Sequence, residues 1–347
     1  MTKLPFYARW TIILLGIILV GYLMVVAKFI LIPFFWSVFL ALLLAPPVQW
    51  LERHRFPSGL AIALVMIVAT VVMGFVFYII SSQIISLVSE LPSITRQLER
   101  WYHEVRTAVE TYLGIPYEQQ RAELLKSLSS YLEQGLNTVG NTLSYTAKTV
   151  TMLGIMPVYV FLLLYYQQSF AEFVRQLYRH RQPDQALELL SKAGTVVQGY
   201  LRGLLMVTLL VGLMAFGVFV ALGVKYALVF ALFVALFNLI PYVGVFVAST
   251  VSILYVFLTT DSLWYPFLTF VLLWGIQLVE NNIITPYVVG SKIKLNPLVV
   301  VLTVFAGAAI WGVSGMVLFI PMVGAMKVLL DEKEGTQAYG YLLGAKR

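Results

Sequence analysis

The sequence predicts an all-α polytopic membrane protein, on the basis of its composition, its long apolar segments and a polar cluster inside one of them. Of the 347 residues, 60% are hydrophobic and 11% are charged, whereas a soluble domain carries about 25% charged residues. A single core cannot bury that apolar excess, so lipid must solvate much of the surface. The chain has no cysteine, which excludes disulfides and Cys-ligated metals.

Eight apolar segments are long enough to cross a bilayer. The first ends just before Lys28, and the second is expected to end at Pro46 and Pro47, because proline disrupts helices. The third is long enough to protrude from the bilayer as one continuous helix. In chain order the segments are residues 11–27, 29–44, 58–88, 147–166, 200–224, 226–258, 263–289 and 297–330.

The sixth and eighth segments are interrupted. As one helix, residues 226–258 would be about 50 Å long, against a hydrocarbon core of about 30 Å. Pro241 lies in the middle and should break the helix. The eighth segment contains Gly307, Gly312, Gly315 and then Pro321. This pattern favours two re-entrant hairpins, and the alternative is one tilted, kinked span in each case.

Two polar stretches separate the apolar segments. Residues 89–145 and 167–199 contain patterns typical of amphipathic helices. We expect N-terminal membrane helices at 1–88, an extracytoplasmic helical insertion at 89–146, the fourth span with a cytoplasmic amphipathic segment at 147–199, a C-terminal set of membrane helices at 200–330, and a cytoplasmic tail at 331–347.

Basic residues indicate the orientation of the chain. Lys3 and Arg9 precede the first segment, Arg53 and Arg55 follow the second, and a further basic stretch follows the fourth. The positive-inside rule assigns this side to the cytoplasm, so we expect cytoplasmic N- and C-termini in the cell (inner) membrane. No long Lys/Arg run is present, so the net charge of +7 predicts a bilayer partner and no nucleic acid.

The strongest candidate site is a polar cluster in the seventh segment. Gln277, Glu280 and Asn281 have the spacing of one α-helical face, and Asn282 follows. A carboxylate at membrane depth costs several kcal/mol unless protein or water solvates it, and such groups are functional by default. Glu280 could therefore bind a proton, a cation or a solute. The alternative is a structural role at the membrane interface or in an ion pair with Arg202.

The break in the sixth segment is the second candidate site, because unwound backbone can coordinate ions or polar solutes. Its residues are Asn238, Pro241, Tyr242 and Gly244. A simple helix kink is the alternative. The remaining conformationally special residues are expected to act as hinges or packing positions: Pro286, Gly290, Pro297, Gly307, Gly312, Gly315 and Pro321. The three histidines are scattered, so no metal site is expected.

The C-terminal third resembles the autoinducer-2 (AI-2) exporter family of permeases. The matching motifs are IPYVG at 240–244, ENNIITPYVVG at 280–290, NPL at 296–298 and MKVLLDE at 326–332. Asn296 departs from the family pattern, where histidine is frequent. The resemblance implies a transporter of small solutes, associated with AI-2 export in some members and with sodium or lithium/proton antiport in others. It also implies a pentamer whose moving part is built from the interrupted helices.

These observations favour a secondary transporter that exports a small polar solute by alternating access, coupled to H⁺ or Na⁺. The last four apolar segments would form the transport unit. No Walker A loop, HExxH, serine elbow or Cys nucleophile is present, so we expect neither an enzyme nor a cofactor. Two alternatives remain: a Na⁺(Li⁺)/H⁺ antiporter that uses Glu280, and a non-transporting membrane scaffold whose outer segment recruits partners.

Overall fold

The computed structural model describes residues 5–89, 146–178, 183–241, 243–260, 262–289, 295–332 and 335–344. Within these ranges the chain is helical, apart from turns and one isolated bridge between Leu295 and Gly344. The predicted all-α membrane class is confirmed. Five helical stretches in the described part are long and apolar enough to cross a membrane. The predicted insertion at 89–146 lies outside the described residues except at its two ends.

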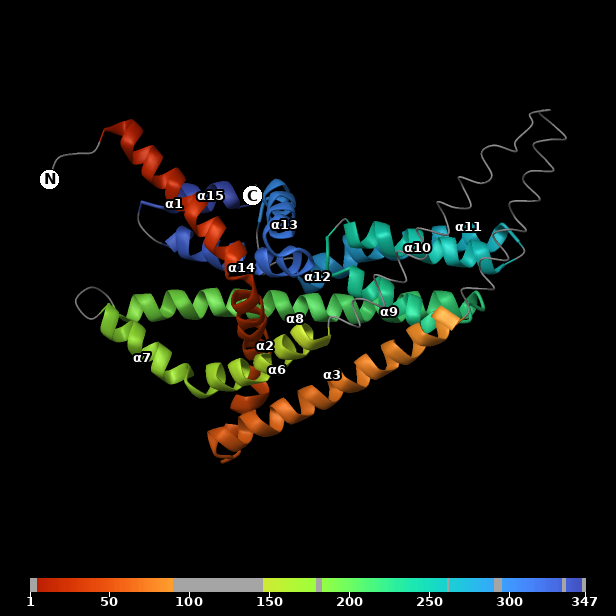
Figure 1. Cartoon of the computed structure of the whole chain (residues 1–347), viewed down its shortest axis with the longest axis horizontal. Coiled ribbons are helices and arrows are strands. Elements are labelled where there is room, and N and C mark those ends of the chain that lie inside the picture. The colour runs from red at the N-terminus through yellow and green to blue at the C-terminus, as the bar shows by residue number, and fades with distance from the viewer. Residues whose placement is uncertain are drawn as a thin grey trace.

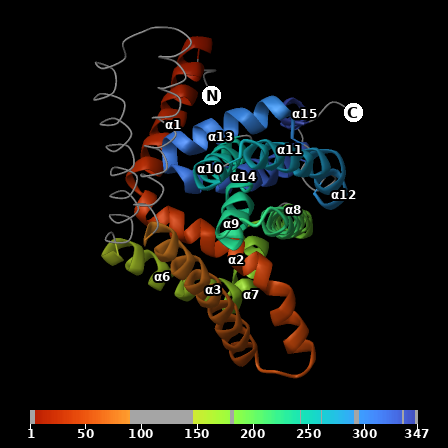
Figure 2. The same cartoon turned by 90° about the vertical axis from the view of Figure 1, so that its right-hand side faces the viewer.

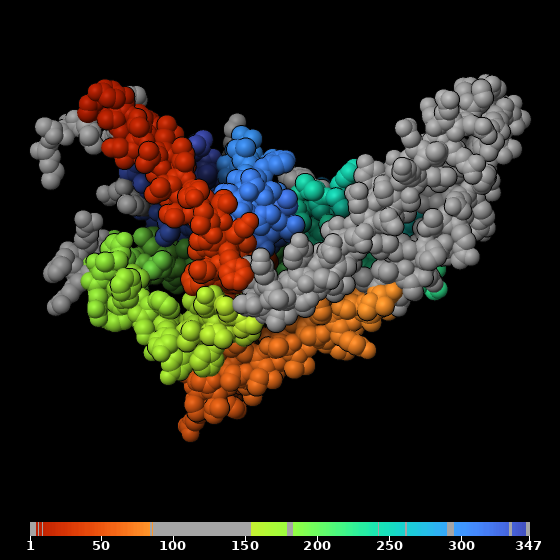
Figure 3. Space-filling model, viewed as in Figure 1, coloured from red at the N-terminus to blue at the C-terminus, as the bar shows by residue number. Residues whose placement is uncertain are grey.

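The N-terminal helices are α1 (Phe6–Val26), α2 (Lys28–Arg53), α3 (Ser58–Ser89) and α6 (Thr146–Tyr165). Helices α2, α3 and α6 pack around a small apolar cluster that includes Val48, Ile62 and Val160. Most apolar side chains of α1 and α3 remain exposed, as expected for surfaces that face lipid. Figure 3 shows α1 and α3 along opposite edges of one face of the molecule.

The predicted end of the second segment at Pro46 and Pro47 is wrong, because α2 continues through both prolines to Arg53. Proline lacks the amide that would bond to the carbonyl four residues earlier, which for Pro46 is the carbonyl of Leu42. Gln198 replaces that donor, with its Nε2 2.5 Å from Leu42 O. A side chain from a distant helix therefore satisfies the carbonyl that Pro46 leaves without its usual partner.

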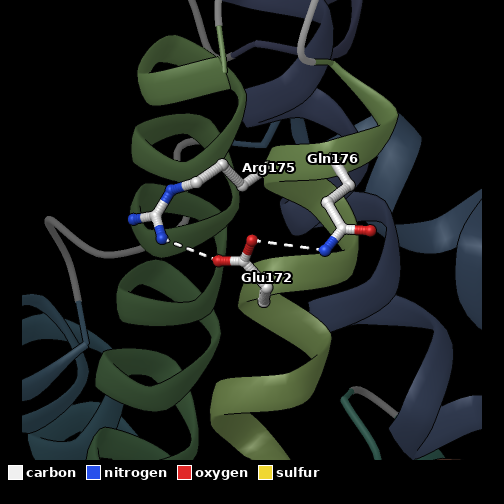
Figure 4. A network of polar contacts seen from close by, with 3 residues as sticks. All are labelled: Glu172, Arg175 and Gln176. Carbon is white, nitrogen blue, oxygen red and sulfur yellow. Dashed lines mark hydrogen bonds and ion pairs between the residues drawn. The ribbon is translucent and has the colours of Figure 1, made fainter.

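The fourth segment is followed by α7 (Gln167–Leu177), which is amphipathic. One face carries exposed Phe170, Phe173 and Leu177. The opposite face carries a polar network in which Glu172 accepts hydrogen bonds from Arg175 Nη1 at 2.8 Å and from Gln176 (Figure 4).

Helix α8 (Pro183–Ala221) is 39 residues long and has no break near position 200, where the fifth apolar segment was predicted to begin. Its polar N-terminal part is tied to the end of α14 (Val313–Glu332) by an ion pair of 3.0 Å between Lys192 Nζ and Glu332 Oε1. Hydrogen bonds to Glu332 and then Glu188 raise the pKa of Lys192. Helix α8 is the central helix. It contacts α2, α7 and α14, and also α9 (Ala227–Phe237), α11 (Trp264–Val279) and α12 (Thr285–Val288).

A glycine turn ends α8 and reverses the chain. Gly223 adopts a φ of +69°, and Val224 N bonds to Phe219 O, which is the hydrogen bond of a Schellman cap. The chain then forms α9 (Ala227–Phe237) and α10 (Val243–Thr259), separated by a turn at the predicted break. The sixth segment is therefore two packed helices.

The seventh segment is continuous but not uniformly α-helical. It comprises α11 (Trp264–Val279), a π-helical turn η1 (Glu280–Ile284) and α12 (Thr285–Val288). Helices α8 to α11 bury a shared apolar core that includes Val211, Phe230 and Val256. Figure 1 shows α10 and α11 running alongside the C-terminal half of α8, with the chain reversing direction between successive helices.

The eighth segment also consists of two helices, α13 (Pro297–Trp311) and α14 (Val313–Glu332), followed by the short α15 (Gln337–Leu343). Gly312 has a φ of +62° and separates them, whereas Pro321 stays inside α14. Figure 2 shows three tiers: α2, α3 and α6 at the bottom, α8 and α9 in the middle, and α10 to α14 above.

The contact between α13 and α14 yields a first prediction. A Cβ atom at Gly307 would overlap the carbonyl group of Gly315, which is backbone and cannot move aside. Gly307→Val should force the two helices apart and destabilise the fold by about 1–3 kcal/mol. Thermal unfolding in detergent, followed by size-exclusion chromatography, measures the loss. Gly275→Ala is the control, because a Cβ there meets nothing within 4 Å. Equal melting temperatures for both variants would contradict the predicted close packing.

The bond that supports α2 yields a second prediction. Gln198→Met keeps the length of the side chain but removes the donor to Leu42 O. Loss of the only described donor that replaces the missing proline amide should lower the unfolding free energy by about 1–3 kcal/mol. Gln176→Met on the exposed α7 is the matched control and should leave the melting temperature unchanged. A Gln198→Met variant as stable as the wild type would refute the role of this bond.

Candidate functional site

Among the described residues, Glu280 carries the only buried carboxylate. The residue is 8% exposed and directly follows the largely apolar helix α11. The hydroxyl of Thr285 donates a hydrogen bond to Glu280 Oε1. The carboxylate is therefore held by a neutral donor from the next turn of the same helix.

A π-helical turn creates this pairing. Thr285 N bonds to Glu280 O, which is an i→i+5 bond, and Pro286 follows without an amide of its own. In an α-helix, residues five apart point in different directions, but i→i+5 bonding places them one above the other. The turn therefore brings the Thr285 hydroxyl over the Glu280 carboxylate. Such turns occur often at functional sites.

The predicted face of Gln277, Glu280 and Asn281 is only partly present. Glu280 is buried and Gln277 is half-buried, but Asn281 and Asn282 are exposed on this chain. Asn282 donates from Nδ2 to the carbonyl of Leu278 at 2.8 Å. The π turn is the physical reason, because it shifts the residues after Glu280 out of the α-helical register on which the prediction depended.

Glu280 makes no ion pair with any cation that the structure describes. The predicted alternative partner, Arg202, is itself exposed. An ionised carboxylate that is buried without a counter-charge is unfavourable, so the burial of Glu280 requires a compensating interaction inside the protein. No cluster of three or more His, Asp or Glu side chains suitable for a metal occurs in the described part of the chain.

Helix α8 forms one wall of this region. A Cβ at Gly203 would lie 2.9 Å from Val289 Cγ2 and 3.1 Å from Val288 O, so the glycine permits close approach to the end of α12. The approach fixes the backbone that follows Glu280 against the central helix. Pro286 is exposed on α12, and Gly290 lies outside the described residues.

The break in the sixth segment is a tight turn. Asn238 and Pro241 are each half-buried, and Gly244 N bonds to Ile240 O at 3.1 Å. A Cβ at Gly244 would overlap the carbonyl of Phe237, so only glycine permits this closure. Tyr242 lies outside the described residues.

The two predicted parts of the site lie on different sides of α8. Gly212 approaches Ala235 of α9, since a Cβ on this glycine would lie 3.0 Å from Ala235 Cβ. Gly203 and Gly212 are nine residues apart, which is two and a half helical turns, so they face opposite directions. Figure 2 shows the same arrangement with α8 seen end-on, because α9 and α12 flank it on opposite sides.

The other special residues have structural positions. Pro297 is the first residue of α13, and Asn296 caps that helix by accepting from Leu298 N at 3.0 Å. Asn296 therefore has a structural role at the start of α13. Gly307 and Gly315 pack together, and Gly312 makes the turn. Sequence reasoning missed Thr285, because α-helical spacing does not place it on the face of Glu280, although Pro286 gave a signal that the helix is irregular there.

The pairing of Thr285 and Glu280 yields a third prediction. Thr285→Val removes the donor and leaves Glu280 without its described hydrogen bond, so the unfolding free energy should fall by about 1–3 kcal/mol. Thr285→Ser keeps the hydroxyl and should keep most of the stability. Melting curves in detergent compare the variants. The pairing would be contradicted if the serine and valine variants unfolded at the same temperature.

Comparison with known proteins identifies the family of the chain. The chain is 26% identical over 336 residues to the AI-2 transport protein TqsA of Escherichia coli (strain K12), with 94% of each protein covered. It is 22% identical over 347 residues to YueF of Bacillus subtilis (strain 168), which is named provisionally as a transport protein, with 92% and 91% covered. The model of the AI-2E family transporters matches residues 11–335. The chain therefore belongs to the AI-2E family of transporters and is a multi-pass membrane protein.

Proposed function

We propose that this protein is a secondary transporter that exports a small polar solute by alternating access, coupled to a proton or sodium gradient through Glu280. The observation that carries the proposal is the burial of this carboxylate with one neutral hydrogen-bond donor and no described counter-charge. Protonation or cation binding neutralises such a group, and neutralisation changes the free energy of the surrounding conformation.

The energy source follows from the motifs of the chain. The sequence contains no Walker A loop, so uphill transport must use an ion gradient or a partner protein. A carboxylate that alternates between a neutral and a charged state is the simplest group through which an ion gradient can act. Glu280 is the buried acidic residue among those described.

The solute is proposed to be an AI-2-like small polar molecule. The support is the name of the E. coli relative, which describes transport of AI-2, together with the match over nearly the whole of both chains. Asn238, in the break of the sixth segment, carries an amide of the kind that can hydrogen-bond such a solute.

The moving part is proposed to consist of the last four apolar segments. The sixth and eighth each fold into two helices that pack against one another, and we propose that both are re-entrant hairpins. The placement of basic residues supports cytoplasmic N- and C-termini in the inner membrane. The exposed apolar surfaces of α1 and α3 could serve a homo-oligomer, and the family resemblance favours a pentamer.

Transport in proteoliposomes tests the role of Glu280. With AI-2 as the probe, the wild type should move it faster when a proton or sodium gradient is imposed. Glu280→Gln mimics the neutral state permanently, so it should abolish the gradient-driven component while allowing slow equilibration. Glu172→Gln on the exposed α7 is the matched control and should behave as the wild type. Unchanged transport by Glu280→Gln at every pH would refute the coupling role.

A further inference from the structure

Thr208 on α8 carries the unusual hydroxyl of this structure. Its Oγ1 is buried. Among the described residues, no other buried side-chain oxygen or nitrogen lacks a hydrogen-bond partner. In membrane helices a hydroxyl can normally bond to the carbonyl one turn earlier. Several hydroxyls of this protein bond to the carbonyl four residues earlier, namely those of Ser37, Ser252, Thr259, Thr260 and Thr269.

The helix register places Thr208 beside the break in the sixth segment. The Phe219 and Phe230 rings lie 6.0 Å apart, and Gly212 faces Ala235. Residues earlier in α8 therefore lie beside residues later in α9, which means that the two helices are antiparallel. One further turn backward from Gly212 reaches Thr208, and one further turn forward from Ala235 reaches Leu239, which is inside the break.

Thr208 also lies on the correct side of α8 for this contact. Each residue turns an α-helix by about 100°, so Thr208 is about 40° from Gly212 and about 140° from Gly203. It therefore belongs to the flank that faces α9 and the break, and not to the flank that faces α12. Helices α8 and α9 lie side by side in Figures 1 and 2.

We propose that Thr208, together with Asn238 of the break, forms a solute subsite for an uncharged molecule that carries hydroxyl or carbonyl groups. A threonine hydroxyl and an asparagine amide each donate and accept hydrogen bonds. Helices α9 and α10 contain no charged residue, so a bare cation in this place would have no counter-charge. The subsite is separate from Glu280, which lies in the segment on the α12 flank and serves the coupling ion.

The buried Thr208 hydroxyl lowers the stability of the unliganded protein, and this cost is the physical reason for proposing a ligand there. A hydroxyl removed from water without a partner is unfavourable, and a solute that bonds to it removes this penalty only when bound. The inference rests on the proposed transport function but assigns a different group, and its test does not depend on Glu280.

The absence of cysteine from the chain permits a direct test. Thr208→Cys is reconstituted in proteoliposomes and exposed to methanethiosulfonate ethylammonium, a small hydrophilic thiol reagent. Modification requires access of water and thiolate. A subsite that takes up a polar solute must open to water during transport, so Thr208→Cys should react at least about ten times faster than Thr269→Cys, a fully buried control in α11. AI-2 should slow the reaction at position 208. Equal, negligible rates at both positions would overturn the proposal.

A second pair of variants keeps the proposal falsifiable if the cysteine variant fails to fold. Thr208→Val removes an unsatisfied hydroxyl at constant shape, so it should raise the melting temperature while it slows AI-2 transport. Thr208→Ser should retain transport, and Thr269→Val should not affect it. Full transport by Thr208→Val would overturn the subsite. If Glu280→Gln transports like the wild type but Thr208→Cys is reactive, the proposed ion coupling is wrong and the subsite is supported. If Glu280→Gln loses gradient-driven transport but Thr208→Cys is unreactive, only the proposed subsite is wrong.

Discussion

Lipid offers no hydrogen bonds, and this constraint determines how the helices of the protein can be interrupted. Every main-chain group that a proline or a bend releases must find a partner inside the protein. Gln198 supplies that partner to the carbonyl of Leu42 beneath Pro46, and the indole of Trp311 donates to Met24 O near the junction of α1 and α2 at 2.9 Å. Both bonds join segments far apart in the sequence, so the satisfaction of local irregularities also fixes the tertiary arrangement.

The same constraint explains which features the sequence could predict. Pro241 and Gly312 mark real interruptions, because local chemistry alone makes a straight helix unfavourable there. Pro46 and Pro47 do not end their helix, because the compensating donor is 156 positions away from Leu42 and no local pattern reveals it. Roughly, the helical segments were predictable from periodicity, whereas their continuity depended on distant side chains.

The candidate site shows the same division. Burial of Glu280 was predictable from the cost of a carboxylate in an apolar segment. The pairing with Thr285 was not, because it requires a π turn whose register differs from that of an α-helix. Thr208 gave no signal at all, since its significance depends on the absence of a bond that other hydroxyls in the structure make. The assigned roles of these residues remain predictions.

The end of the chain constrains how the eighth segment can move. Asn296 N bonds to Leu343 O at 2.8 Å, so the start of α13 is fastened to the far side of α15. Gly340 lies directly against Asp331, which anchors α15 on the last turns of α14. Together with the glycine contact between α13 and α14, these two contacts hold α13, α14 and α15 to one another. Displacement of this hairpin is therefore expected to carry α13, α14 and α15 together as one rigid body.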